Sequence, residues 1–97
     1  MFYHIVLMRF SEEADPRFFR RVDEYVDRVK NQLPYVRGYH LMRNVASRSA
    51  GFEWVIVSTF DNSAAHDEYQ VSTVHQEMKA FMGPYITEIV ACDGSVE

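Results

Sequence analysis

The sequence predicts an α+β domain of the ferredoxin-like class, with the element order β-α-β-β-α-β and a split second helix. Four segments rich in β-branched and aromatic residues alternate with two helical segments in this order. At 97 residues, the chain is long enough for one core and little more. We therefore expect a single domain over residues 1–97, with a four-stranded antiparallel sheet and the helices on one face.

The first strand and the first helix have the clearest patterns. Residues 2–10, FYHIVLMRF, are dense in β-formers and too short for an amphipathic helix, which predicts a central strand buried on both faces. Asp15 followed by Pro16 is typical of a helix start. Apolar residues then recur every three or four positions as far as Leu33, where Pro34 ends the helix.

Two strands in the middle of the chain form a predicted hairpin. Residues 38–46 and 52–60 are rich in β-branched and aromatic residues, and the polar stretch SRSAG between them has hairpin length. Residues 86–94 supply the last strand. In the ferredoxin-like order the first strand lies beside the third, which suits its hydrophobicity on both sides.

The second helical segment contains a break. We expect Asn62 or Ser63 to cap its start, but the stretch VST contains weak helix formers that are good caps. Thr73 with Gln76 three residues later fits a capping box, so a new helix is expected to begin there. The following Gly83-Pro84 pair predicts its end.

This break decides whether Tyr69 and His75 can act together. Six residues along a straight helix are about 600° of rotation, which would place the two rings on nearly opposite faces. At an elbow between two short helices the rings can converge. We therefore expect Tyr69 and His75 to face one cavity between the sheet and the split helix, with His4 at its floor.

Composition and charge exclude several classes of partner. The 10 basic residues are outnumbered by 14 acidic ones, whereas a nucleic-acid binder needs a concentrated basic field. No apolar run approaches the roughly 20 residues that span a bilayer. The single cysteine, Cys92, cannot form an intrachain disulfide, which is typical of the reducing cytoplasm. We expect a cytoplasmic protein with no nucleic-acid or membrane partner.

One face of the predicted sheet has no covering helix. Alternation places a set of apolar residues on this face: Tyr3, Ile5, Leu7, Val55, Val57, Val90 and Cys92. Soluble monomers rarely expose an apolar patch of this extent. A second copy of the same sheet is the simplest cover, so we expect a homodimer with two-fold symmetry.

Four segments, HIVLMRF, LPYVRGYHLMRNV, GFEWVIVSTFD and YQVSTVH, resemble in this order the stress-responsive α/β-barrel (Dabb) family. The resemblance implies a ferredoxin-like dimer whose sheets form an α+β barrel. It also implies similarity to olivetolic acid cyclase, a plant member that closes a linear poly-β-ketone by aldol condensation. That enzyme uses a tyrosine and a histidine spaced as Tyr69 and His75 are, and a first-strand histidine that matches His4. Its third-strand histidine is replaced here by Trp54, which is bulky enough to narrow or close the pocket.

His75 and Tyr69 are the candidate catalytic residues. A neutral imidazole can remove an α-proton from a ketone, and the start of a helix disfavours the charged ring. Tyr69 can donate a hydrogen bond to a substrate carbonyl or orient His75. Both residues also have a structural interpretation. His75 can simply be hydrogen-bonded to a carbonyl, and Tyr69 can be an amphipathic ring of the core. His4 is a candidate ligand-binding residue, or else a buried group with a structural hydrogen bond.

The remaining wall of the expected pocket is apolar and partly aromatic, which suits a small-molecule site. Its residues are Val6, Met8, Val22, Val26, Trp54, Ile56, Met78, Phe81 and Ile89. We expect His40 and His66 at the surface, and no HExxH, HxH or Cys-His spacing predicts a metal site. No phosphate loop or flavin motif is present, so no cofactor is expected.

These residues leave three functions open. The first is a binding or stress-response domain that captures a small hydrophobic molecule, such as a phenol or a polyketide-like ketone. The second is a cofactor-free polyketide cyclase or lyase that uses His75 and Tyr69 as an acid–base pair. The third, a distant alternative, is a dimeric-barrel monooxygenase that acts on phenols or haem. The sequence alone does not decide whether the chain is an enzyme.

Overall fold

A computed structural model of the chain describes residues 1–96; Glu97, the last residue of the expected domain, lies outside the described residues. The elements are β1 (Phe2–Phe10), α1 (Pro16–Gln32), β2 (Val36–Arg43), β3 (Trp54–Phe60), α2 (Ser63–Gln70), α3 (Thr73–Met82), a 3₁₀ turn η1 (Gly83–Tyr85) and β4 (Ile86–Ser95). This order confirms the predicted ferredoxin-like class with a split second helix.

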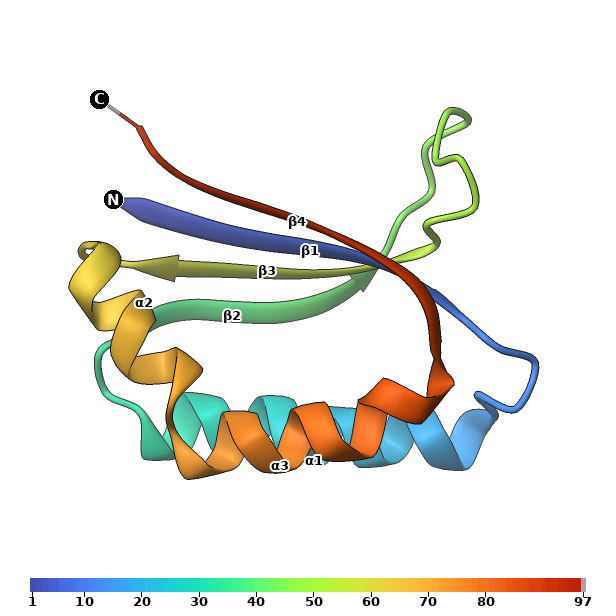
Figure 1. The fold of residues 1–97 in the computed structure, drawn as a ribbon, viewed down its shortest axis with the longest axis horizontal. Helices are drawn as coiled ribbons and strands as arrows, with labels where there is room; N and C mark the ends of the chain where they lie inside the picture. The colour runs from blue at the N-terminus through green and yellow to red at the C-terminus, as the bar shows by residue number, and fades with distance from the viewer. Residues whose placement is uncertain (97) are drawn as a thin grey trace.

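The four strands form one antiparallel sheet in the order β2-β3-β1-β4. β1 is therefore central and lies beside β3, as predicted. Helices α1 and α3 run side by side under one face of the sheet, and α2 turns up toward the end at which both chain termini lie (Figure 1). Within residues 1–96, no helix is long and apolar enough to cross a membrane.

The strand register decides which side chains face the helices. His4 lies opposite Ser58 on β3 and Asp93 on β4. Residues directly opposite each other project from the same face of a sheet. His4 and Asp93 therefore share the face that carries the helices, whereas Ile5 and its partners lie on the other face.

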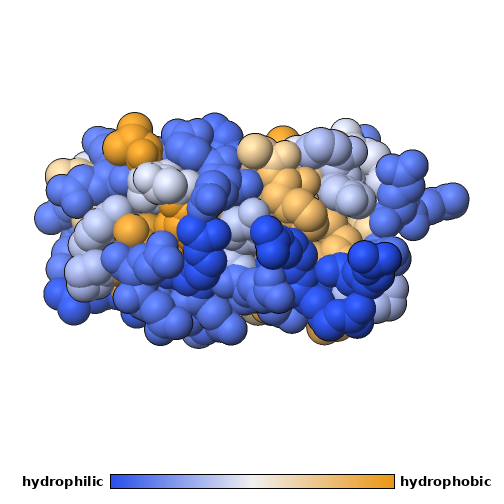
Figure 2. Space-filling view, turned by 90° about the horizontal axis from the view of Figure 1, so that it is seen from below, coloured by the Kyte–Doolittle hydropathy of each residue, from blue (hydrophilic) through white to orange (hydrophobic). Residues whose placement is uncertain are grey.

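The core forms between the sheet and the helices. The helix α1 contributes one stripe of buried residues, and the sheet, α2 and α3 supply the rest: Met8, Phe18, Val22, Tyr25, Val26, Val29, Tyr39, Ile56, Phe60, Tyr69, Val74, Met78 and Met82. The outward face of the helical layer is mostly hydrophilic, with smaller hydrophobic areas (Figure 2). Burial of the α1 stripe is the main stabilising contribution of this amphipathic helix.

The ends of α1 and of the hairpin differ in how well the sequence predicted them. The carboxylate of Asp15 accepts a hydrogen bond from the backbone N–H of Phe18 at 2.9 Å, which confirms the predicted cap. The hairpin connection, however, spans residues 44–53 instead of five residues. It is longer because Asn44 bonds back to Phe52 and Glu53, and because Ala50 and Gly51 adopt positive φ angles.

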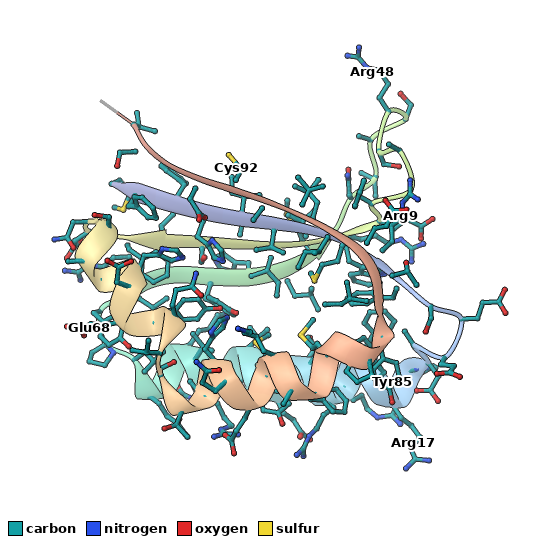
Figure 3. The ribbon with its side chains drawn as sticks, in the orientation of Figure 1. Arg9, Arg17, Arg48, Glu68, Tyr85 and Cys92 are labelled. Atoms are coloured by element: carbon teal, nitrogen blue, oxygen red, sulfur yellow. The ribbon has the colours of Figure 1, made fainter. Side chains whose placement is uncertain are left out.

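The helix-free face of the sheet carries Cys92. Alternation predicted this residue on that face, and its side chain is exposed and points away from the helices (Figure 3). Val90 on the same strand is 50% exposed. Tyr3, Ile5 and Leu7 on β1 are only partly buried, so this face presents an apolar surface that no helix of the described chain covers.

Candidate functional site

The site is built around the elbow between α2 and α3. α2 ends at Gln70 and α3 begins at Thr73, which confirms the predicted break. The N-cap of α3 is Ser72, one residue before the expected Thr73. The Ser72 hydroxyl donates to the carbonyl oxygen of Tyr69 at 2.7 Å and accepts from the backbone N–H of His75 at 3.3 Å. A single side chain therefore joins the two helix ends.

The elbow brings the two candidate rings together. The ring centroids of Tyr69 and His75 lie 4.3 Å apart. Both side chains line a cavity of about 240 Å³ between the sheet and the split helix, and His4 lines it as well. The elbow and the strand register therefore bring all three residues to one cavity.

The other residues of the cavity wall are mostly apolar. Val6, Met8, Ile56, Met78 and Ile89 line the cavity as expected, and Met82 at the end of α3 and Ile86 and Ala91 on β4 extend the wall. Tyr39, Gln70 and Lys79 add three further polar side chains. Ile89 and Lys79 are exposed to solvent, so they mark the open side of the cavity.

Four residues expected in the wall lie elsewhere. Val22 and Val26 belong to the core, because α1 packs its own stripe mainly under the edge strand β2, away from the cavity. Trp54 packs its ring on Phe19 at 4.4 Å between centroids, and it therefore neither narrows nor closes the cavity. Phe81 turns toward an aromatic cluster between α1 and η1. The cavity is instead bounded by α2 and α3 on one side and by the sheet, chiefly β1 and the edge strand β4, on the other.

The hydrogen bond of His75 fixes its tautomer. Its Nδ1 lies 3.1 Å from the carbonyl oxygen of Gln70, which can only accept, so Nδ1 carries the hydrogen. In the neutral ring, Nε2 then holds the lone pair. Burial lowers the pKa of His75 below its ordinary value, and the nearby Lys79 ammonium lowers it further, although the Gln70 carbonyl acts in the opposite direction. The ring is therefore neutral at pH 7.

Tyr69 is a neutral phenol with a buried partner. Its hydroxyl lies 2.7 Å from the hydroxyl of Tyr39, and either group can donate. Burial raises the pKa of Tyr69 well above its ordinary value and that of Tyr39 to about 12. The Tyr39 hydroxyl also donates to the sulfur of Met78 at 3.3 Å, and in that arrangement Tyr69 donates to Tyr39. When the Tyr39 hydrogen instead turns from Met78 to Tyr69, the Tyr69 hydrogen is available to a ligand oxygen.

Sequence patterns did not single out Tyr39 or Asp93. Tyr39 alternates with Gly38 and His40 on β2, which was a signal for the core face but not for a contact with Tyr69. Asp93 is paired with His4 only through the register of β1 and β4, and its carboxylate contacts His4 Nδ1. Such a contact between the two ends of the chain has no local sequence signal.

His66 was expected at the surface, and this expectation is wrong. Its side chain is buried, with the ring centroid 4.4 Å from that of His4. His66 lies three positions before Tyr69, so both project from the side of α2 that faces the sheet. His40, in contrast, is exposed as expected.

The lowered pKa of His75 predicts that stability falls in acid. The unfolded ring, with a pKa of about 6.5, binds protons that the folded ring excludes. The free energy of unfolding should therefore be highest above about pH 6.5 and decline as the pH falls toward the lower folded pKa. In urea denaturation between about pH 7.5 and 5, the free energy of unfolding should decline less in His75→Gln than in the unaltered chain.

The control for this measurement is His40→Gln, which changes an exposed histidine and should leave the pH dependence as in the unaltered chain. Burial also lowers the pKa of His66, so part of the decline should remain in His75→Gln. A decline of equal size in His75→Gln and in the unaltered chain would show that His75 is not a buried neutral ring.

Comparison with known proteins shows close similarity of fold. The Arabidopsis thaliana protein At3g17210 is 17% identical, with a TM-score of 0.88 over 100% of this chain and 96% of that chain. A hydroxynitrile lyase from Passiflora edulis is 18% identical, with a TM-score of 0.87 over 99% and 93%. A dimeric ferredoxin-like protein of unknown function from Jannaschia sp. CCS1 is 21% identical, with a TM-score of 0.86 over 98% of both chains.

At these identities the similarity to solved structures establishes the fold alone. No curated protein matches the sequence significantly. The model of one protein family matches residues 2–96, which is nearly the whole chain. The chain therefore belongs to the Dabb family, described as the stress responsive A/B barrel domain.

Proposed function

We propose that the chain binds a small, largely apolar phenol or carbonyl compound in the cavity between the split helix and the sheet. The observation that carries this proposal is the convergence of Tyr69 and His75 on an otherwise apolar wall. Ligand sites commonly combine apolar walls with a few polar groups that orient the ligand. Tyr69 would donate a hydrogen bond to a ligand oxygen, and Nε2 of His75 would accept one from a ligand hydroxyl.

The size of the cavity restricts the ligand. Its volume of about 240 Å³ is below the roughly 300–1,000 Å³ typical of drug-sized sites. A compact molecule of about one ring fits this space, whereas a long poly-β-ketone would have to extend through the open side. The Lys79 ammonium at that side favours a ligand with a negatively charged or strongly polar end facing solvent.

The binding proposal is tested by filling the cavity from its edge. Ala91 lines the cavity on the exposed strand β4, so Ala91→Leu adds bulk to the site without overpacking the core. The added leucine side chain should occupy part of the ligand's space and weaken binding of a hydroxylated aromatic aldehyde roughly tenfold or more, which is about 1.4 kcal/mol or more. Isothermal titration calorimetry measures this, after native mass spectrometry has shown which compounds remain bound on purification.

The matched control is Ala80→Leu, an equal change at an exposed position of α3 outside the cavity. It should bind the same compound with unchanged affinity. If both leucine variants bind as tightly as the unaltered chain, the ligand does not occupy this cavity.

A second candidate function is a cofactor-free lyase or cyclase that acts on a carbonyl compound. It is favoured by the bond between His75 Nδ1 and the Gln70 carbonyl, because this bond presents Nε2 as a base. From a ketone, Nε2 would take an α-proton, and the C–H electron pair would move to the carbonyl oxygen as an enolate. From a cyanohydrin, Nε2 would take the hydroxyl proton, a C=O bond would form, and cyanide would leave with the electron pair of the broken C–C bond. Tyr69 would stabilise the developing charge on the substrate oxygen by donating a hydrogen bond. The similarity to a hydroxynitrile lyase supports a test of cyanohydrin substrates.

The catalytic proposal predicts a large effect of His75→Gln. Loss of a positioned general base should reduce turnover about 10²–10⁴-fold. Tyr69→Phe should cost less, because the ring remains and only the hydrogen bond is lost. Steady-state assays of cyanohydrin cleavage and of aldol cyclisation measure both effects. Equal turnover in His75→Gln and the unaltered chain would exclude this mechanism. If neither the unaltered chain nor the variants turn over any of these substrates, binding is the function.

We also propose that the functional unit is a homodimer formed by the helix-free faces of two sheets. A structural neighbour from Jannaschia sp. CCS1 is described as dimeric. The face presents Tyr3, Ile5, Leu7 and Val90, which are partly or largely accessible in one chain. A stable interface of this kind buries more than roughly 1,000 Å². Val55 contributes less than expected, because its neighbours already bury it.

The dimer is tested by Ile5→Asp, which places a charge at the centre of this face. Burying an unpaired carboxylate is costly, so the variant should be monomeric or aggregated when the unaltered chain sediments as a dimer at micromolar concentration. Val45→Asp is the control, because Val45 is 88% exposed in the loop of residues 44–53. A well-folded monomer of the unaltered chain under these conditions would contradict the proposal.

A further inference from the structure

We propose that His4, His66 and Asp93 form a binding site for a divalent transition-metal ion of the zinc type. Each residue offers one ligand atom, and these three atoms lie within 4.8 Å of one another. The residues come from three different elements, β1, α2 and β4, which the fold brings to one end of the sheet. Their separation in the sequence explains why no short metal-binding motif predicted the site.

The arrangement is close to a coordination shell. A tetrahedral zinc ion with bonds of about 2.0–2.1 Å places its ligand atoms roughly 3.4 Å apart, so the present atoms need only small side-chain rotations. His4 Nδ1 already contacts a carboxylate oxygen of Asp93, and an ion would enter between the two. The side chain of Asp93 is 43% exposed, which provides both the freedom to move and a path for the ion.

The buried position of His66 is the observation that an ion pair alone does not explain. A pair of His4 and Asp93 satisfies both of those groups without a third polar ring. His66 is nevertheless 6% exposed, with its centroid 4.4 Å from that of His4. The Gln70 amide nitrogen donates to His66 Nε2 at 2.9 Å, which fixes the orientation of the ring. The amide can turn so that its oxygen faces the ring and accepts the second ring hydrogen, as the partners of ligand histidines do.

The donor set selects the class of ion. Two imidazoles and one carboxylate suit Zn²⁺, Co²⁺ or Ni²⁺, whereas Mg²⁺ and Ca²⁺ prefer oxygen ligands throughout. Three protein ligands leave at least one position for water or another ligand. Because His4 also lines the cavity, this position is next to the space in which we place the small molecule. The metal site itself does not depend on that proposed function.

The test uses Co²⁺ as a spectroscopic probe on untagged protein that has been treated with chelator and dialysed. Co²⁺ should give visible d–d absorption bands that saturate at a single ion per chain, and Zn²⁺ should displace it. Asp93→Asn keeps the fold because Asp93 is exposed, and it should weaken Co²⁺ binding by roughly 10–100-fold or more. His66→Phe keeps the ring packing against Phe2 and Phe60 and should do the same.

Two histidine controls separate this site from its surroundings. His40→Phe changes an exposed histidine and His75→Gln changes the cavity histidine, and both should leave the Co²⁺ titration unchanged. The proposal is overturned if Co²⁺ produces no saturable absorption, or if binding persists with equal affinity in Asp93→Asn and His66→Phe. Loss of metal binding and loss of small-molecule binding are measured separately, so either proposal can fail without the other.

Discussion

The candidate site depends on the hydroxyl of Ser72, which bonds to the end of one helix and to the start of the next. On a continuous helix, Tyr69 and His75 would point in nearly opposite directions. The hydroxyl instead accepts from His75 and donates to the Tyr69 carbonyl, which holds the chain in an elbow of two residues. Replacing a serine cap by alanine typically costs about 1 kcal/mol, so this small contribution maintains the relative position of the two rings.

Burial then sets the chemistry of the rings that the elbow brings together. Desolvation keeps His75 neutral and prevents Tyr69 from ionising. The pair can therefore offer one lone pair and one hydrogen-bond donor, but it carries no charge of its own. A site of this type suits a ligand that has a polar oxygen on an otherwise apolar body. Lys79, at the open side of the cavity, is the nearest positive charge on the wall.

Hydrophobic periodicity and helix-capping residues were sufficient to predict the fold. β1 and α1 have strong apolar patterns, and the VST stretch contains the cap residues that divide the second helix. The site was predicted less well. Trp54 and Val22 were assigned to the cavity wall because their side chains were expected on the inner face of a strand and of a helix. The face of an element does not determine where along the sheet a cavity forms. His66 was placed at the surface because polarity was weighed above its spacing from Tyr69. Asp93 depends on strand register, a non-local property that no short segment encodes.

The most direct test of the account is the protonation state of His75 in the folded protein. Long-range ¹H–¹⁵N correlation spectra of histidine-labelled protein at pH 7 report which ring nitrogen carries a hydrogen. The structure predicts a neutral ring with hydrogen on Nδ1 and a lone pair on Nε2, because the Gln70 carbonyl accepts from Nδ1. A charged ring, or a neutral ring with hydrogen on Nε2, would contradict the geometry on which both the binding and the catalytic proposals depend.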